Sequence, residues 1–124
     1  MLEIKDAEQS IARHIFKDAG LSYCEESSHC MLAKNGDEAL GYVLFNMENG
    51  AISLLKLSPE EPPMLADSLL RSALFYAANH GIMDARFENT VSGNLIQKLG
   101  FCDNPSSGRI DITELFHSCG GCGK

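Results

Sequence analysis

The sequence predicts an α/β fold in which a mixed, mostly antiparallel central sheet carries helices on both faces. Two turn signals, Asn35-Gly36 and Glu48-Asn49-Gly50, separate three apolar runs and predict an antiparallel meander. A long helical stripe then leads into a further alternating run, which predicts a strand, helix, strand crossover with one parallel pair. The 124 residues are near the usual size of one domain.

The N-terminal part is predicted to form a leading strand and one amphipathic helix. Residues 1–5 alternate apolar and charged side chains, as a strand does. Residues 6–19 place apolar side chains at spacings of three and four, which makes one face of a helix. We expect Asp6 to cap the first amides, with Gln9 as in a capping box, and Gly20 to end the helix in a left-handed conformation.

The three apolar runs of the meander cover residues 30–33, 39–47 and 51–57. The middle run is apolar on both alternating faces, which is typical of a central strand covered by helices on both sides. The third run is expected to stop at Ser58-Pro59, because proline removes a donor from the hydrogen-bond ladder.

The C-terminal half is predicted to hold the main helix, over residues 65–80, and Gly81 supplies its stop signal. Residues 83–88 alternate strictly and form the parallel strand of the crossover. A short helix over 92–99 and a last strand over 109–116 are expected to complete the fold.

Composition excludes several partners. A formal net charge of −7 counts against nucleic acid, since phosphate backbones are bound largely by Lys and Arg. No apolar run reaches the roughly 18 residues that a membrane helix needs. Five cysteines without a recognisable export signal favour a reducing compartment. We therefore expect a cytoplasmic protein with free thiols and no nucleic-acid or membrane partner.

Three segments, in order, resemble the GNAT family of N-acetyltransferases. Leu40-Gly41-Tyr42-Val43 looks like the family's central strand, and Ser68-Leu69-Leu70 through His80-Gly81 looks like its main helix. Asn89, followed by Ser92 and by the run from Leu95 to Leu99-Gly100-Phe101, is similar to its closing motif. The resemblance implies that residues 1–116 form a single GNAT-like domain, followed by a Cys- and Gly-rich tail over 117–124.

The resemblance also implies a reaction and a cofactor. The cofactor is acetyl-CoA or another acyl-CoA, and the acceptor is an amine of a small molecule or of a protein. Backbone groups of Leu55 and Leu57 would hold the pantetheine arm, and Asn89 would be a further contact. The residues that would face the phosphates at the start of the main helix are Ala66, Asp67 and Ser68.

The loop before the main helix departs from the family's pattern, which has Arg or Gln followed by glycines that cradle the pyrophosphate. Here Glu61 places a negative charge near the phosphates, and Pro62 and Pro63 each remove an amide donor. Met64 adds bulk at a glycine position, and only Ala66 fits the pattern. The other interpretation of this segment is that it is simply a well-capped helix start, because proline suits the first turn of a helix.

Candidate catalytic groups are few. The resemblance places Ile96 where the family commonly has a tyrosine acid, so that acid is absent. Glu88, beside Asn89, is the best placed carboxylate for a general base, although outward charges on such strands are usually only solvated.

The tail offers a second signal. Cys119 and Cys122 have the spacing of a redox pair or of half a zinc site, but a flexible glycine-rich tail is the alternative interpretation. Nothing in the pattern brings further ligands to them, so no metal site is assigned. Two hypotheses remain: a GNAT-like acyltransferase, and a catalytically degenerate GNAT-like module that binds another ligand or a protein partner, with a thiol or metal role for the tail.

Overall fold

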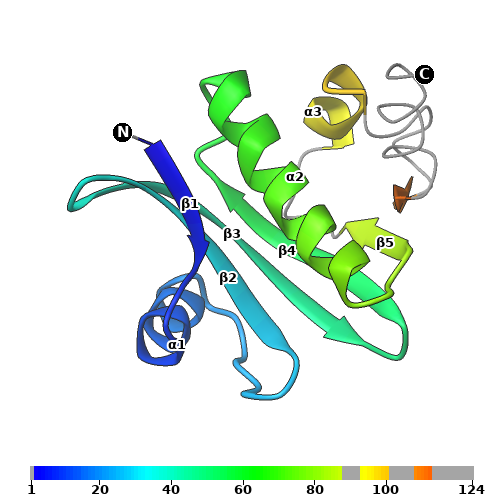
Figure 1. The fold of residues 1–124 in the computed structure, drawn as a ribbon, viewed down its shortest axis with the longest axis horizontal. Helices are drawn as coiled ribbons and strands as arrows, with labels where there is room; N and C mark the ends of the chain where they lie inside the picture. The colour runs from blue at the N-terminus through cyan, green and yellow to red at the C-terminus, as the bar shows by residue number, and fades with distance from the viewer. Residues whose placement is uncertain (1, 88–92, 101–107, 113–124) are drawn as a thin grey trace.

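The computed structural model describes residues 2–87, 93–100 and 108–112, and Figure 1 shows their arrangement. The order of strands and helices along the chain is the one that the sequence predicts. The elements are β1 (Leu2–Asp6), α1 (Gln9–Asp18), β2 (Ser28–Asn35), β3 (Glu38–Glu48), β4 (Ala51–Ser58), α2 (Pro63–Asn79), β5 (Asp84–Phe87), α3 (Gly93–Lys98) and β6 (Arg109–Asp111).

The described strands form one six-stranded sheet in the order β1-β2-β3-β4-β5-β6. All neighbouring strands are antiparallel except β4 and β5, which run parallel and are connected by α2. Asn49 and Gly50 turn β3 into β4 with φ angles of 55° and 76°, in the left-handed region that such turns require. The predicted mixed sheet with one parallel crossover is confirmed.

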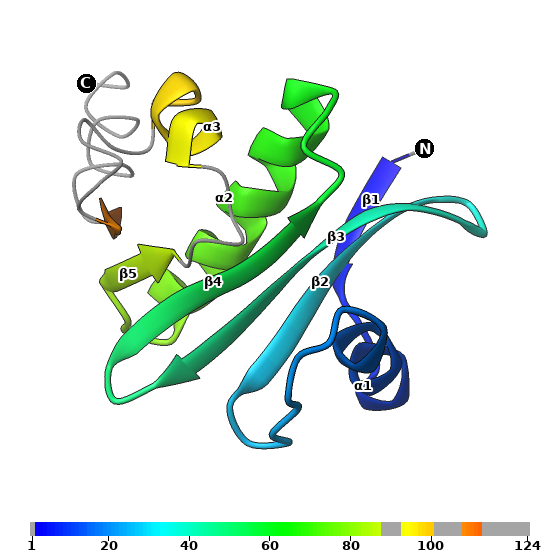
Figure 2. The same cartoon turned by 180° about the vertical axis from the view of Figure 1, so that it is seen from behind.

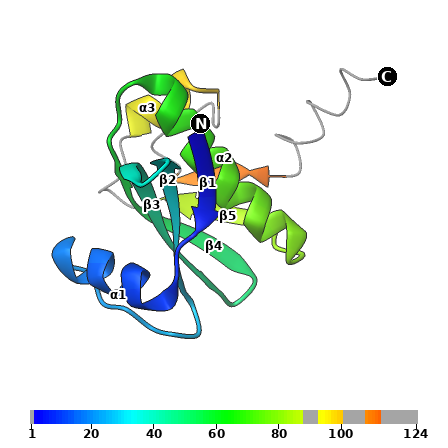
Figure 3. The ribbon, with the colours of Figure 1, turned by 60° about the vertical axis from the view of Figure 1, so that its left-hand side comes forward.

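The helices cover opposite faces of the sheet (Figure 3), so the predicted layering is also confirmed. On one face, Phe16 and Ala12 of α1 pack with Cys30 and Leu44. On the other face, α2 buries a continuous stripe against the strands, and Ile96 of α3 joins this larger core. The buried residues of α2 are Ala66, Leu69, Leu70, Ala73, Leu74 and Ala77.

The predicted capping role of Asp6 is wrong. Asp6 is the last residue of β1 and pairs with Met31, so the sheet and not the helix takes up its backbone. The helix α1 begins at Gln9, and its N-cap residue Glu8 makes no side-chain cap hydrogen bond. The predicted helix end is confirmed, since Gly20 has a φ of 75°.

Gly41 of β3 is required by a close approach. A Cβ atom at this position would lie 2.6 Å from the Ser58 carbonyl oxygen and 2.7 Å from Pro59 Cδ. The segment that joins β4 to α2 therefore packs directly on the backbone of β3. No helix among the described residues is both long and apolar enough to cross a membrane.

Candidate functional site

The strand β4 changes its register half way along its length. Leu44 of β3 faces Lys56, whereas the next residue, Phe45, faces Leu54, so Leu55 is the extra residue of a β-bulge. A bulge bends its strand and increases the local twist. The Leu55 side chain packs on the α1 face of the sheet, while Leu57 is buried on the α2 face.

The bulge lies where β5 stops following β4. The parallel register covers Ala51–Leu54, and within the described part of the chain no strand pairs with residues 56–58 on the side away from β3. This end of β4 runs on to the loop before α2 (Figure 2). Leu55 and Leu57, which the resemblance assigns to the pantetheine arm, thus lie in one bent stretch of strand at this edge.

The start of α2 has few amide donors. A helix leaves its first four N–H groups without helical partners, and such groups favour anions. Here the N-cap is Pro62 and the first helical residue is Pro63, and neither has an N–H. The Leu65 amide donates to the Pro62 carbonyl at 3.0 Å. Of the four residues 62–65, whose amides have no partner in the helical pattern, only Met64 keeps an amide that could face a phosphate.

The three residues implied to face the phosphates lie on different sides of α2. Ala66 is fully buried in the core, and its amide donates to the Pro62 carbonyl at 3.2 Å. The half-exposed Asp67 carboxylate accepts hydrogen bonds from Arg71 Nε at 3.0 and 3.1 Å. The Ser68 carbonyl accepts the Ser72 hydroxyl. A carboxylate, balanced by an arginine, therefore stands one turn inside the helix start.

Of the remaining candidate site residues, the structure describes only the one at position 96. The Ile96 side chain is fully buried in the α2-side core, so this position carries no proton donor. The candidates Glu88 and Asn89 and the tail over 117–124 lie outside the described residues. In the described ranges, no three His, Cys, Asp or Glu side chains are grouped so that they could hold a metal ion.

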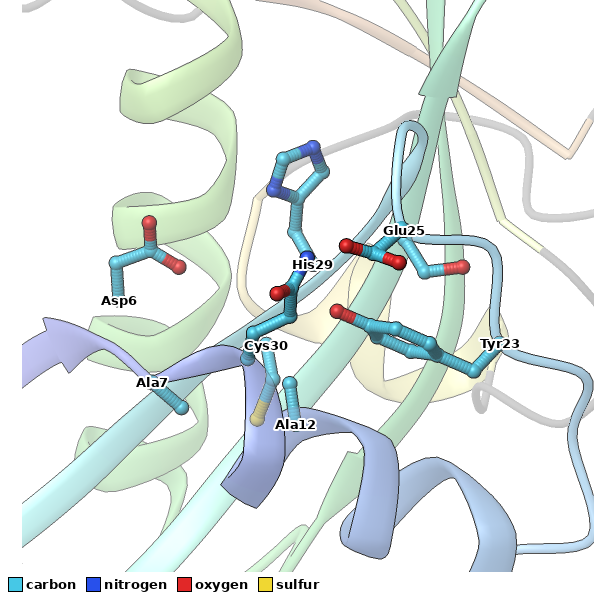
Figure 4. A pocket seen from close by; sticks show the side chains of 9 residues that line it. Asp6, Ala7, Ala12, Tyr23, Glu25, His29 and Cys30 are labelled. Atoms are coloured by element: carbon cyan, nitrogen blue, oxygen red, sulfur yellow. The ribbon is translucent and has the colours of Figure 1, made fainter.

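A cavity of about 210 Å³ lies at the opposite edge of the sheet, and sequence reasoning missed it. It opens where β1 ends and the chain leaves the sheet to form α1 (Figure 4). No local motif marks it, because its residues come from β1, α1, the following loop and β2. They are Asp6, Ala7, Gln9, Ala12, Tyr23, Glu25, Ser28, His29 and Cys30.

Two side chains that line this cavity, His29 and Cys30, have pKa values shifted from their ordinary values. Burial lowers the pKa of His29, while the Asp6 charge opposes the shift and His80 adds to it. Burial raises the pKa of the Cys30 thiol to about 12, and Asp6 contributes to that rise. At neutral pH the imidazole is therefore mostly uncharged and Cys30 remains a thiol.

Comparison with known proteins gives a result at the level of the fold. No protein-family model matches the sequence, and no curated protein matches it. Among solved structures, a protein from Desulfovibrio desulfuricans that is assigned to the GNAT family of acetyltransferases superposes with a TM-score of 0.58 and 13% identity, covering 82% of this chain and 85% of that one.

Two enzymes give similar values. The ribosomal-protein-S18-alanine N-acetyltransferase of Escherichia coli has a TM-score of 0.58 and 14% identity, covering 82% of this chain and 78% of that one. A Bacillus subtilis acetyltransferase solved with CoA has a TM-score of 0.57 and 17% identity, covering 82% and 77%. The chain therefore has the GNAT fold.

Proposed function

We propose that this protein binds acyl-CoA, mainly through the pantetheine arm of the cofactor, and transfers the acyl group to an amine. The observation that carries the proposal is the bulged end of β4, where Leu55 and Leu57 lie beyond the register with β5. Backbone groups at such an edge can accept an extended chain that carries amides, as the pantetheine arm does. The fold, which the CoA-bound Bacillus subtilis acetyltransferase shares, supports the same cofactor.

The start of α2 is expected to add little to cofactor affinity. Pro62 and Pro63 remove two donors, and hydrogen bonds to charged groups contribute roughly 1.5–3 kcal/mol each. Two lost donors correspond to an affinity lower by roughly two to four orders of magnitude, at about 1.4 kcal/mol for each factor of ten. The exposed carboxylates of Glu60 and Glu61 precede the helix and also disfavour phosphates.

The transfer itself requires an unprotonated amine. Its nitrogen attacks the thioester carbonyl carbon, the carbon–sulfur bond breaks, and CoA leaves as a thiolate that takes up the proton released by the nitrogen. Because a thiol has a pKa of about 8.5, the thiolate leaves without a strong acid. This suits a site in which Ile96 replaces a tyrosine. We assign to Glu88, which follows Phe87 at the end of β5, the role of the base that removes the proton from the ammonium form of the acceptor before the attack.

A second function is favoured by the differences between this chain and the family's pattern at the start of α2 and at position 96. With one amide at the start of α2 and a buried aliphatic side chain at position 96, the chain would be a non-catalytic module on the GNAT scaffold. Such a module would bind another small ligand or a protein partner, and Cys119 and Cys122 would give its tail a thiol or metal role.

A thermal-shift titration with acetyl-CoA, combined with a transfer assay on a panel of amines, separates the two. Cofactor at about ten times its Kd stabilises the native state by about 1.4 kcal/mol, which raises the Tm by several degrees. A thermal shift together with formation of an acylated amine supports the acyltransferase, provided that Glu88→Gln reduces the amount of acylated amine formed. A shift without product on any amine supports the module, and the absence of a shift at millimolar acetyl-CoA rejects cofactor binding.

A further inference from the structure

Strand β1 forms one border of the sheet, and its outer side is open (Figure 1). It pairs with β2, and no other described strand lies beside it. Four of its five residues are exposed, and only Ile4 is half-buried. A strand at a border presents unpaired N–H and C=O groups, which can pair with a strand of another chain.

The hydrogen bonds to β2 decide which backbone groups of β1 point outwards. The Ala7 amide donates to the Cys30 carbonyl at 2.8 Å, and this pair continues the register of the two strands. In an antiparallel ladder, residues that exchange hydrogen bonds with the neighbouring strand alternate with residues that do not. Residues 3 and 5 therefore bond to β2 as Ala7 does. The residues whose N–H and C=O groups point away from β2 are Leu2, Ile4 and Asp6.

The side chains of β1 divide between the two faces of the sheet. Ile4 packs against the core under α2, so Leu2 and Asp6 lie on the same face. Both of these end residues are exposed, so α2 does not cover the border. Glu3 and Lys5 lie on the opposite face, where their side chains are 59% and 73% exposed and form an ion pair of 3.7 Å. Because such an exposed pair contributes little to stability, both charges are available to a second chain.

A second copy of β1 is complementary to this border when it runs antiparallel. With Ile4 opposite Ile4 of the second copy, the outward groups of residues 2, 4 and 6 meet their counterparts and can form about six hydrogen bonds. The same register places Glu3 opposite Lys5 of the second copy, and Lys5 opposite its Glu3. These pairs are not hydrogen-bonded through the backbone, so their Cα atoms approach to about 4.5 Å and their side chains are close.

The charges of β1 also exclude the neighbouring registers. A shift by one residue sets outward groups against residues that already bond to β2. A shift by two residues places Glu3 opposite Glu3 in one direction and Lys5 opposite Lys5 in the other. Like charges directly opposite each other are destabilising. Pairing about Ile4 is therefore the register that satisfies both the backbone and the charges.

We propose that two copies of this chain associate through β1, in antiparallel register about Ile4, and form one continuous sheet across a twofold axis. On the α2 face, Ile4 of each copy lies diagonally beside Leu2 of the other and covers part of this side chain, which is 47% exposed in the single chain. On the opposite face, the charges of Glu3 and Lys5 from both copies alternate in sign. Strands β2 and β3 separate β1 from β4, so the pairing leaves the edge proposed for acyl-CoA open, and the inference does not rest on that function.

Sedimentation velocity of the full chain, from about 10 μM to about 1 mM and at about 150 mM salt, tests whether the dimer forms. The paired strands are short and the interface is small, so we expect a weak dimer with a Kd of about 10–500 μM. Amide exchange over the same concentrations tests where it forms: the Ile4 amide should slow at least about twofold, and the Lys5 amide, already bonded to β2, should slow less. A chain that stays monomeric at about 1 mM, or a dimer in which Ile4 is not protected, overturns the proposal.

Charge exchange tests the register. Glu3→Lys and Lys5→Glu each set like charges opposite each other in the dimer, and each should weaken dimerisation at least about fivefold. Glu3→Lys makes the net charge of the chain less negative, so general repulsion between acidic proteins predicts tighter association for this variant instead. Glu48→Lys, at the end of β3, changes the net charge equally and should not weaken the dimer. Equal weakening by Glu3→Lys and Glu48→Lys contradicts the proposal.

Combining the two exchanges restores the charge pattern. An equimolar mixture of the Glu3→Lys and Lys5→Glu chains brings opposite charges together, so the heterodimer should form at least about fivefold more tightly than either variant alone. The double variant should recover the original Kd within about threefold, a margin that allows for Lys34, which faces position 3 from β2. Both exchanged side chains are exposed, and unchanged urea midpoints check that every variant is folded. A mixture that associates no better than the single variants contradicts the proposed register.

Discussion

Replacing Gly41 with alanine probes how the sheet supports the segment between β4 and α2. The added Cβ would lie 2.6 Å from the Ser58 carbonyl oxygen, 2.7 Å from Pro59 Cδ and 3.4 Å from Leu69 Cδ1. The first two contacts involve backbone or ring atoms that cannot rotate away. The backbone of the loop must therefore move, and with it the end of β4 that we assign to the cofactor.

The expected cost follows from two opposing effects. Gly41 has an ordinary negative φ, so without a clash alanine would stabilise the protein by about 0.4–1 kcal/mol. Overpacking of a tightly packed site costs about 1–3 kcal/mol. We expect Gly41→Ala to destabilise the protein by about 1–2 kcal/mol, which lowers the urea midpoint by roughly 1 M for a chain of this size.

Urea denaturation of Gly41→Ala and of Gly20→Ala separates steric from conformational effects. A Cβ at Gly20 meets no atom within 4 Å, but its φ is 75°, so only left-handed strain of about 1 kcal/mol is expected there. Acetyl-CoA binding should weaken in Gly41→Ala and not in Gly20→Ala. An unchanged or increased stability of Gly41→Ala would refute the close packing of this loop on β3.

Three further outcomes are expected. Leu70→Ala should cost about 2–5 kcal/mol of unfolding free energy in urea denaturation, because Leu70 is fully buried. Met64→Ala should change the unfolding free energy by no more than about 0.5 kcal/mol, because Met64 is 82% exposed; similar losses in both variants would contradict the core assignment. Met64→Gly should tighten CoA binding by opening the one amide left at the helix start, and unchanged affinity would show that bulk there is unimportant. The pKa of Asp84 lies below its ordinary value because Arg109 donates a hydrogen bond to its carboxylate, so the stability that this carboxylate contributes is present above the ordinary pKa and is lost as pH falls. Arg109→Gln should raise the pKa of Asp84 in an NMR titration, and an unchanged pKa would exclude that hydrogen bond as the cause.

Local chemistry accounts for what the sequence predicted well. The turn at Asn35-Gly36 and the apolar stripe of α2 depend on neighbours a few residues away, and both are found where expected. The end of α1 at Gly20 is predicted for the same reason, since a left-handed residue is needed there.

Features that depend on pairing between distant residues were not predictable. Asp6 satisfies a local capping rule, but its pairing with Met31 across the sheet overrides that rule and places its side chain on the α2 face, as that of Met31 is. The bulge at Leu55 exists only relative to the residues that face it in β3. The cavity at the end of β1 combines residues from both ends of the segment 6–30, so no short window of sequence contains its pattern.

The most direct test of the central claim compares CoA with pantetheine, which lacks the nucleotide and its phosphates, by isothermal titration calorimetry. If the cofactor is held mainly through the arm at Leu55 and Leu57, and the helix start offers a single amide, the two Kd values should agree within about tenfold. CoA binding more than about a hundredfold tighter than pantetheine would show that the phosphates dominate. Failure of both to bind would contradict the account altogether.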